Sequence, residues 1–442
     1  MKKHLVVVSV DAMVAEDVPV LLHMPNTAAL FRSHLLIKRM QTIYPSLTHP
    51  VHASIITGQP CGETGIIHNE RFNPYASSAE WYNTLSDIRG ETLFHCAHLA
   101  GLKTGVARWP VTACGNDIID YLIPEILDAD LANGVTMQQA LIHGGAGPIW
   151  ETIVQPNLNR LEQGNDRPGY DAFSAACAAD MICKYQPDLL FTHWGMVDSA
   201  RHHHGLFGPA VIDALVLTDR WIGWLAQAVR DAGIIEQTNF VVLSDHGQLS
   251  FCQKVRLNAL FAKHGLIQLD SQGRLQTYRA IAHSCGMGAQ IYLQNPLDKA
   301  LCSQVRGLLE NELPTESHTY FEVMDAKETA NRFGLQGGFS FVVETDGKTL
   351  FESEASGPIF KKINPNHPRS LYATHGHMPD KGPQPIFLAT GPSFVRKTLE
   401  IGNILEIAPT LALTLGLSMK RSAMPARLDW LVPEVSQTIS VL

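Results

Sequence analysis

Aspartate and histidine residues recur beside short apolar runs along this 442-residue chain, and together they could bind metal. Carboxylate oxygens and imidazole nitrogens are ligands that borderline divalent metals accept, zinc above all. Six such ligands are too many for one tetrahedral ion, but they suit two ions roughly 4 Å apart. Two ions at that spacing can clamp the entering and leaving oxygens of a displacement at phosphorus. The candidates are Asp11, Asp198, His202, Asp245, His246 and His375.

The segment YPSLTHPVH, residues 44–52, supplies a candidate nucleophile. Pro45 ends an apolar run, Pro50 suits a first helical turn, and Gly58 is a typical helix end. Thr48 is therefore expected at a strand-to-helix corner, where the positive end of a helix dipole and unpaired backbone N–H groups favour negative charge. Such a corner suits a nucleophile that attacks phosphorus. The alternative is that Thr48 is only a helix N-cap.

Each candidate ligand also has an ordinary explanation when it is considered alone. Asp11 could cap a helix, Asp198 and His202 could form a surface pair at i,i+4 spacing, and His375 could be a hydrogen-bonded loop residue. The pair Asp245-His246 is harder to dismiss, because charged groups directly behind a buried strand need a partner. The residues alone do not decide which of His202, His203 and His204 binds metal, nor which of His375 and His377 does.

The elements that position these residues follow from the hydrophobic pattern. Continuous apolar runs suit central strands that are covered on both faces, and helical patterns with stop signals separate them. Strands alternating with helices predict a doubly wound, mostly parallel α/β sheet with helices on both faces. The carboxyl ends of its strands would bring the candidate ligands to one edge. The expected strands are residues 4–10, 36–43, 102–109, 188–195, 239–244 and 385–391.

Between residues 253 and 369 the alternation of strands and helices gives way to several short strand-like runs and one helical stretch, and we expect this segment to form a small α+β cap. Residues 1–252 and 370–442 would then form the catalytic core. Because ligand motifs bracket the cap, it should reach the active-site edge and contact the leaving group. Residues 345–348 predict a hairpin turn. A less regular segment, residues 112–169, could be a lid or a small insertion. Three aromatic residues of the cap, expected in the core rather than stacked on substrate, are Tyr320, Phe339 and Phe341.

Composition narrows the class of protein. The net charge of -8 and the absence of a Lys/Arg run argue against binding of nucleic-acid polymers. The eight cysteines form no C-x-x-C pair and are expected to be mostly reduced, buried thiols. Asp11 interrupts the apolar N-terminal run, which favours a buried strand over a signal peptide. No apolar run reaches membrane-spanning length. The composition does not exclude a small phosphorylated substrate as partner. We therefore expect a cytoplasmic protein with no membrane partner, and the oligomeric state is left open.

The order of the motifs resembles a known family. Asp11 is followed by P-S-L-T-x-P-x-H-x-x-x-x-T-G, G-x-x-x-N, D-x-x-x-H, S-D-H-G and T-H-G. This order resembles the nucleotide pyrophosphatase/phosphodiesterase (type I phosphodiesterase) branch of the alkaline phosphatase superfamily. The match extends from Asp11 to about Leu415 and includes the Trp109-Pro110 pair. An alkaline phosphatase-like fold is what the resemblance implies.

The resemblance also implies roles for the site residues. Thr48 matches the nucleophile that forms a covalent phospho-enzyme, and Asn69 matches an asparagine that binds a phosphate oxygen together with the backbone N–H after the nucleophile. One zinc would be held by Asp11, Asp245 and His246 and would also bind the Thr48 oxygen. The other zinc would be held by Asp198, His202 and His375. A threonine hydroxyl needs such activation near neutral pH, and growing charge on phosphoryl oxygens needs preset donors.

The sequence departs from that branch beside the nucleophile. His49 and Val51 stand where the branch usually carries phenylalanine and asparagine. His49 could touch the substrate, or it could simply be exposed. We predict a two-zinc hydrolase of phosphodiesters or related phosphate esters. The alternatives are a phosphonoacetate hydrolase-like enzyme that cleaves a P–C bond, and a metal-stabilised binding protein without catalysis. None of the lysines that could form a phosphonocarboxylate pocket is compelling: Lys103, Lys254 and Lys299.

Overall fold

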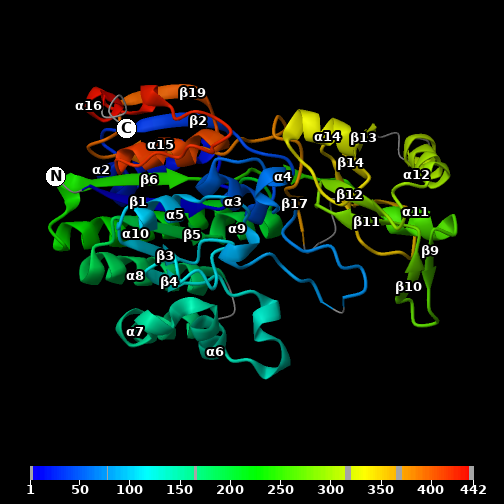
Figure 1. Ribbon diagram of the computed structural model, residues 1–442, viewed down its shortest axis with the longest axis horizontal. Helices are drawn as coiled ribbons and strands as arrows, with labels where there is room; N and C mark the ends of the chain where they lie inside the picture. Colours follow the sequence, from blue (N-terminus) through cyan, green and yellow to red (C-terminus); the bar gives the residue numbers. More distant parts are fainter. Residues whose placement is uncertain (1–2, 77, 164–166, 314–319, 365–370, 438–442) are drawn as a thin grey trace.

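An eight-stranded sheet forms the centre of the computed structural model, which describes residues 3–76, 78–163, 167–313, 320–364 and 371–437 (Figure 1). The strand order is β19-β2-β18-β6-β1-β5-β3-β4. The strands are β1 (His4–Val10), β2 (Leu35–Gln41), β3 (Thr104–Ala107), β4 (Tyr121–Ile123), β5 (Leu189–Trp194), β6 (Thr238–Leu243), β18 (Phe387–Thr390) and β19 (Lys397–Asn403).

The predicted α/β fold with a mostly parallel sheet is confirmed. The pairs β1–β5, β1–β6, β3–β5, β3–β4 and β2–β19 are parallel, whereas β18 runs antiparallel to both of its neighbours, β6 and β2. The short β4 and the polar β19 were not predicted. Because β18 is reversed, the residues before it reach the edge at which β1, β5 and β6 end. This reversal places the segment containing His375 beside the ends of the parallel strands.

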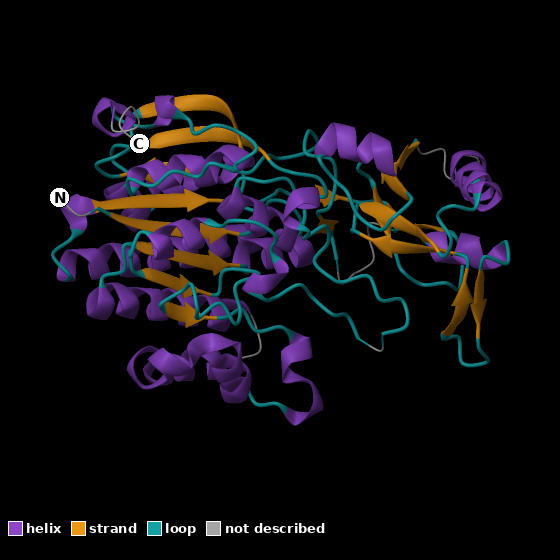
Figure 2. Cartoon of the chain, in the orientation of Figure 1, coloured by secondary structure: helices purple, strands orange, loops and turns teal. Residues whose placement is uncertain are grey.

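Helices cover both faces of the sheet (Figure 2). Along β1, Val6, Val8 and Val10 belong to a core that includes α8 (Arg167–Tyr185) and α10 (Pro209–Asp231). Leu5 and Val7 belong to the core on the opposite face, which α3, α5 and α15 cover. Successive side chains of a strand point to opposite faces, so burial on both faces accounts for the continuous apolar run. The bounds are α3 (Thr48–Thr57), α5 (Leu93–Leu99) and α15 (Ile407–Thr414).

The remaining helices of the core are short apart from α9, which follows β5. They are α1 (Val18–His23), α2 (Pro25–Leu30), α4 (Cys61–Thr64), α9 (Met196–His204) and α16 (Pro433–Gln437). The segment 112–169 contains α6 (Met137–Leu141) and α7 (Gln155–Asn157) between stretches of 3-10 and π helix. It lies along the β4 side of the sheet, at the bottom of Figure 1.

Residues 253–362 form separate small sheets beside the central one, on the right of Figure 1. We propose that residues 253–369 are a distinct cap unit, of which residues 314–319 and 365–369 lie outside the described ones. One sheet has the order β11-β12-β14-β13 and another β15-β8-β16, while β9 pairs with β10 and β7 with β17. The strands of this region are β8 (Gln253–Val255), β9 (Ile267–Leu269), β10 (Leu275–Tyr278), β11 (Ala280–Ser284), β12 (Gly288–Leu293), β13 (Phe321–Asp325), β14 (Phe341–Thr345), β15 (Thr349–Phe351) and β16 (Phe360–Lys362). The pair β7 (Leu249–Ser250) and β17 (Ala373–Thr374) lies just outside it in sequence, one strand before and one after.

The predicted hairpin at residues 345–348 is wrong. The turn exists, but β14 pairs with β12 and β13, whereas β15 pairs in parallel with β8 in another sheet. A turn signal reports local backbone shape, and strand pairing beyond it is decided by packing in the folded chain. The helices of this region are α11 (Leu257–Lys263), α12 (Lys299–Asn311) and α14 (Ala326–Phe333).

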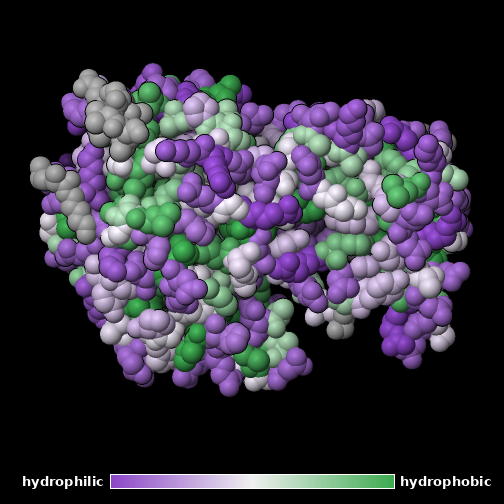
Figure 3. Space-filling view, viewed as in Figure 1, coloured by the Kyte–Doolittle hydropathy of each residue, from purple (hydrophilic) through white to green (hydrophobic). Residues whose placement is uncertain are grey.

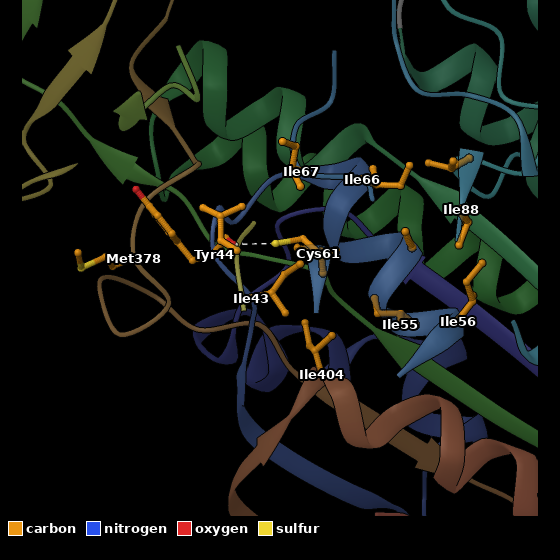
Figure 4. Close-up of a cluster of buried hydrophobic side chains, with 14 of the residues drawn as sticks. Ile43, Tyr44, Ile55, Ile56, Cys61, Ile66, Ile67, Ile88, Met378 and Ile404 are labelled. Atoms are coloured by element: carbon orange, nitrogen blue, oxygen red, sulfur yellow. Dashed lines mark hydrogen bonds between the residues drawn. The ribbon is translucent and has the colours of Figure 1, made fainter. Parts of the chain in front are cut away.

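The core around the start of α3 is drawn in Figure 4. There the Cys61 thiol donates a hydrogen bond to the Tyr44 carbonyl oxygen at 3.2 Å, among isoleucine side chains that include Ile43 and Ile55. All eight cysteines are free thiols, but only four of them are buried, fewer than expected. On the face shown in Figure 3, polar and intermediate residues predominate, and hydrophobic ones gather in small groups. Among the described residues, no helix combines the length and the apolarity needed to cross a membrane.

Candidate metal centre

Thr48 is the first residue of α3. The N-cap is Leu47, and no side chain accepts a capping hydrogen bond, so the alternative that Thr48 serves as an N-cap is wrong. Its hydroxyl oxygen instead lies 3.3 Å from His246 Nε2. The helix ends as expected at Gly58, whose φ of 67° is readily adopted only by glycine. The hydroxyl therefore remains available at the helix start, where backbone N–H groups favour negative charge.

The three candidate aspartates follow neighbouring strands of the sheet. Asp11 comes directly after β1, Asp245 two residues after β6, and Asp198 lies in the first turn of α9, just beyond β5. All three are buried. The parallel register of β1 with β5 and with β6 brings these ends together. The sheet topology thus gathers three carboxylates at one edge, as the sequence predicted.

One group of ligand atoms comes from the three residues predicted to hold the first zinc. Asp11, Asp245 and His246 each offer an atom, and these atoms lie within 4.8 Å of one another. His246 Nε2 is 3.5 Å from Asp11 Oδ1 and 3.2 Å from Asp245 Oδ2. A single ion between them could contact all three residues.

A second group differs from the predicted set in one member. Asp198 and His375 fall within 4.8 Å of each other together with His246, which takes the place expected for His202. His202 is nevertheless close, with Nε2 3.3 Å from Asp198 Oδ1. His246 therefore lies between the two groups, and its ring stacks on that of His375 at 4.0 Å.

Backbone carbonyl groups orient the two outer histidines. His202 donates from Nδ1 to Ala373 O at 2.7 Å, and His375 donates from Nδ1 to Ser46 O at 3.2 Å. In both rings Nε2 is left to face the site, as is usual for metal-binding histidines. The neighbours His203 and His204 are exposed, and His377 belongs to neither group. The geometry therefore favours His202 and His375 among the histidines that the sequence left open.

The electrostatics of the two groups fit bound cations. Burial raises the pKa of the Asp245 carboxyl to about 7, and the nearby Asp198 adds to that rise. Burial lowers the pKa of His246 to about 3. Asp245 Oδ2 is buried without a hydrogen-bond partner among the described residues. Protein groups alone thus leave the ionised carboxylate poorly stabilised, and a divalent cation would supply the missing positive charge.

Several positioning residues were not predicted from the sequence. Gln248 donates from Nε2 to Asp198 Oδ1 at 2.6 Å and to the Asp198 carbonyl oxygen at 3.1 Å. His52 donates from Nδ1 to Thr48 O at 2.7 Å, and its Nε2 lies 2.8 Å from Ser9 Oγ. Both side chains are buried. His52 is the last residue of the motif P-S-L-T-x-P-x-H, and Gln248 directly follows S-D-H-G, so a polar residue within or next to a motif is the signal that could have found them.

Asn69 lies beside the nucleophile, as predicted, but one expected interaction is different. Its Oδ1 accepts a hydrogen bond from the His49 backbone N–H at 3.0 Å. The N–H that was expected to bind a phosphate oxygen is therefore engaged with Asn69. This bond fixes the amide so that the Asn69 nitrogen remains for an incoming oxygen.

The segment that carries Asn69 contacts the proposed cap. His68 donates from Nε2 to Ser284 O at 2.9 Å, and Glu70 Oε2 lies 3.5 Å from His283 Nε2. His68, Glu70 and His283 also offer atoms within 4.8 Å of one another. Because His68 Nδ1 accepts the Glu70 N–H at 2.9 Å, both ring nitrogens of His68 are already used. This cluster therefore joins the cap to the Asn69 segment.

His49 is not exposed, so the alternative stated for it is wrong. Only 1% of the residue is accessible. Its Nε2 lies 3.3 Å from Glu125 Oε2, and its ring meets Trp81 edge-on at 4.9 Å. Both partners are distant in sequence, so their proximity could not be predicted.

A cavity of about 690 Å³ opens over Thr48. Two sets of residues line it: those of the metal groups, here called the metal side, and a second set, here called the wall, which includes Trp81, Arg108, Glu125 and residues 126–129. No described residue of the segment 253–364 lines this cavity, so the expectation that the cap contacts the leaving group finds no support. The segment 112–169, for which a lid or a small insertion was considered, supplies part of the wall.

None of the three lysines considered for a phosphonocarboxylate pocket lines the cavity. Lys103 pairs with Asp120 at 2.7 Å, Lys254 pairs with Glu352, and Lys299 begins α12. The aromatic residues of the cap behave differently from one another. Phe339 and Phe341 are buried as expected, whereas Tyr320 is 70% exposed and not in the core.

Comparisons with known proteins point to one family. The family model for type I phosphodiesterase / nucleotide pyrophosphatase matches residues 5–369. Ectonucleotide pyrophosphatase/phosphodiesterase family member 1 of Mus musculus is 28% identical over 225 residues, 49% of this chain and 21% of that protein. A venom phosphodiesterase of Macrovipera lebetinus is 22% identical over 389 residues, 85% of this chain and 38% of that protein. The chain thus spans well under half the length of these curated relatives.

A solved structure shows the same fold. The murine ectonucleotide pyrophosphatase/phosphodiesterase 5, an inactive variant in complex with AMP, superposes with a TM-score of 0.65 at 18% identity. The alignment covers 98% of this chain and 100% of that one. With the family model matching most of the sequence, the chain belongs to the type I phosphodiesterase / nucleotide pyrophosphatase family.

Proposed function

We propose that this protein is a two-zinc hydrolase of phosphodiesters or related phosphate esters that acts through a covalent phosphothreonine at Thr48. The observation that carries the proposal is the position of the Thr48 hydroxyl, 3.3 Å from Nε2 of His246, the residue shared by both groups of ligands. A hydroxyl at that point can reach a phosphorus atom held at the same edge. Small nucleotides are the first substrates to examine, because the family is named for them.

The proposed zinc ligands are those that the sequence predicted: Asp11, Asp245 and His246 with the Thr48 oxygen for one ion, and Asp198, His202 and His375 for the other. When bound, the two ions would act as Lewis acids that favour the ionised nucleophile and the developing phosphoryl charge. Asn69 would donate from its amide nitrogen to a non-bridging phosphate oxygen, since its Oδ1 is held by the His49 N–H.

The proposed reaction has two displacements at phosphorus. In the first, Thr48 Oγ1 loses its proton and bonds to phosphorus, while the bond to the leaving oxygen breaks and that oxygen keeps the electron pair. In the second, water bonds to the phosphorus of the phosphothreonine, and Oγ1 departs and regains a proton. The sum is hydrolysis of one P–O bond, with Thr48 restored.

A rate comparison on zinc-loaded protein tests this proposal. The substrates are bis-p-nitrophenyl phosphate, p-nitrophenyl phosphate and phosphonoacetate, each with wild type and with Thr48→Ala. We expect the diester to be preferred and Thr48→Ala to lose at least about 10³-fold in kcat, because a nucleophile cannot be replaced by its neighbours.

The other outcomes identify the alternatives. Phosphate release from phosphonoacetate that exceeds diester hydrolysis would move the activity to P–C bond cleavage. Hydrolysis that survives in Thr48→Ala would exclude the phosphothreonine. A protein that binds zinc yet hydrolyses none of the three substrates would point to binding without catalysis.

A further inference from the structure

Arg108 lies at the edge of the sheet that carries the metal groups, immediately after β3. Its backbone φ is 61°, a left-handed conformation that costs energy in residues other than glycine. Its side chain lines the cavity over Thr48 and is 12% exposed. A strained backbone that aims an arginine into a catalytic cavity is a reason to look for a ligand of that arginine.

The guanidinium group is held in place but is not saturated. Nε and Nη1 are buried, and neither has a hydrogen-bond partner among the described residues. Tyr170 places its ring 4.8 Å from the guanidinium carbon. The nearest carboxylate oxygen, Asp171 Oδ1, is 3.5 Å from Nη1, and Asp171 accepts backbone N–H bonds from Gly195 and Met196 at the start of α9. Asp171 is therefore shared with the start of the helix, and it makes no hydrogen bond to Nε or Nη1 of Arg108, whose N–H donors stay unpaired.

The second acidic residue of the wall has its own partner. Burial alone would raise the pKa of Glu125, but its contact with His49, aided by His193 and Arg108, lowers that pKa to about 2. His49 Nε2 stands 3.3 Å from the Glu125 carboxylate. The basic side chain next to Glu125 is thus His49, and the carboxylate next to Arg108 is that of Asp171.

We propose that Arg108 binds a second anionic group of the substrate, a carboxylate or a phosphate, situated beyond the scissile phosphorus. The inference rests on the proposed function and deepens it, because it names the substrate class. A planar guanidinium binds either anion with paired N–H donors, and such charge-assisted bonds are among the strongest in proteins. None of the three lysines considered for a phosphonocarboxylate pocket was compelling from the sequence, and none of them lines the cavity.

Matched inhibitors test the proposal without assuming where the leaving group lies. Methylphosphonate carries one anionic group, phosphonoacetate adds a carboxylate, and methylenediphosphonate adds a second phosphonate. Each would be tested as an inhibitor of bis-p-nitrophenyl phosphate hydrolysis under excess zinc, so that removal of metal does not contribute. We expect at least one two-anion inhibitor to bind wild type roughly tenfold or more tightly than methylphosphonate.

The variants are Arg108→Gln, Arg108→Lys and the control Arg220→Gln, at an exposed arginine of α10. Arg108→Gln should reduce the advantage of the two-anion inhibitor roughly 10- to 100-fold, and Arg108→Lys should keep part of it because it retains charge but not the fork. The control should keep the full advantage. A dependence on Arg108 limited to phosphonoacetate assigns a carboxylate, and one limited to methylenediphosphonate assigns a phosphate.

Two results would overturn the proposal: wild type that binds all three inhibitors equally, or an advantage that is the same in wild type and Arg108→Gln. Calorimetric titration of zinc-loaded Thr48→Ala with the same inhibitors measures binding without turnover. If Thr48→Ala keeps its activity, the proposed function fails, whereas the titrations still decide whether Arg108 binds the second anion. Melting temperatures of the variants identify any loss that comes from misfolding. If Arg108→Gln misfolds, the titration of Arg108→Lys decides between the two outcomes, because it keeps the charge and lacks only the fork.

Discussion

The two sides of the cavity over Thr48 are built in different ways. The metal side comes from residues at the ends of neighbouring strands, and backbone pairing of β1 with β5 and β6 sets their spacing. The wall comes from Trp81, from Arg108 with its left-handed backbone, and from the irregular stretch around Glu125. Regular pairing fixes positions closely, whereas loops carried on the same scaffold can vary. We infer that the sheet edge sets the chemistry of this protein and that the wall sets its choice of substrate.

The largest effect should come from Asp245→Asn, on the metal side. Removing one charge from a buried ligand should lower zinc content and reduce kcat for bis-p-nitrophenyl phosphate by about 10³-fold or more. Metal analysis and steady-state kinetics measure both, with Asp213→Asn, at an exposed residue of α10, as the control. Full zinc content with wild-type kcat would remove Asp245 from the site.

Gln248→Ala should have the next largest effect, because Gln248 holds Asp198 through a bond of 2.6 Å. Loss of such a supporting bond typically weakens metal binding 10- to 100-fold. Activity at limiting zinc should fall by about that factor and should recover when zinc is raised. The exposed Gln227→Ala is the matched control. A defect that excess zinc does not correct would show that Gln248 acts on something other than metal affinity.

Trp81→Ala examines the wall. Its ring packs edge-on against His49 and lines the cavity, so its removal should raise KM roughly tenfold while kcat changes by a smaller factor. Trp81→Phe, which keeps an aromatic ring, should lie between wild type and alanine. Steady-state kinetics with the diester gives both constants. If kcat fell as much as in the metal-side variants, the wall would not be limited to substrate binding, and the distinction between the metal side and the wall would be wrong.

Glu344 belongs neither to the metal side nor to the wall of the cavity. The substitution Glu344→Gln should therefore change stability rather than substrate choice. Burial raises the pKa of Glu344 to about 7, against the opposing effects of Lys381 at 3.0 Å and of Tyr44. The folded state therefore holds this proton more tightly than the unfolded chain does. Its stabilising contribution is present below pH 4.5 and is lost as pH rises through 7. At about 1.4 kcal/mol per pKa unit, the loss is on the order of 3 kcal/mol.

Melting temperatures at pH 5 and pH 8 measure this contribution. Wild type should lose a few degrees more than Glu344→Gln over that interval, on the order expected for a chain of this size. Glu310→Gln, at an exposed residue of α12, should follow wild type. Parallel pH dependence in all three proteins would contradict the assigned pKa.

The metal side was predictable because its signals are local. Asp11, Asp198 and the pair Asp245-His246 each follow an apolar run, and a parallel sheet necessarily collects such positions at one edge. His375 was predicted as a ligand from the order of the motifs. The antiparallel direction of β18 is the physical reason that it reaches the same edge. The fold class followed from the alternation of strands and helices.

The wall was not predictable because its contacts join distant segments. His49 is buried by Trp81 and Glu125, which no periodic pattern links to the nucleophile. The polar strand β19 carries no apolar signal, since most of its residues are exposed or only partly buried. The turn at residues 345–348 was recognised, but the partners of its two strands depend on packing within the cap.

The position of β18 also has a consequence for how the chain is made. This strand lies between β2 and β6, yet it comes from residues 387–390. Until those residues leave the ribosome, β2 and β6 each keep an unpaired edge that could pair with other chains. At roughly 5–20 residues per second, synthesis from the end of β6 to β18 takes on the order of ten seconds. The nascent protein therefore exposes the middle of its own sheet until late in translation, and His375 emerges only shortly before the sheet can close.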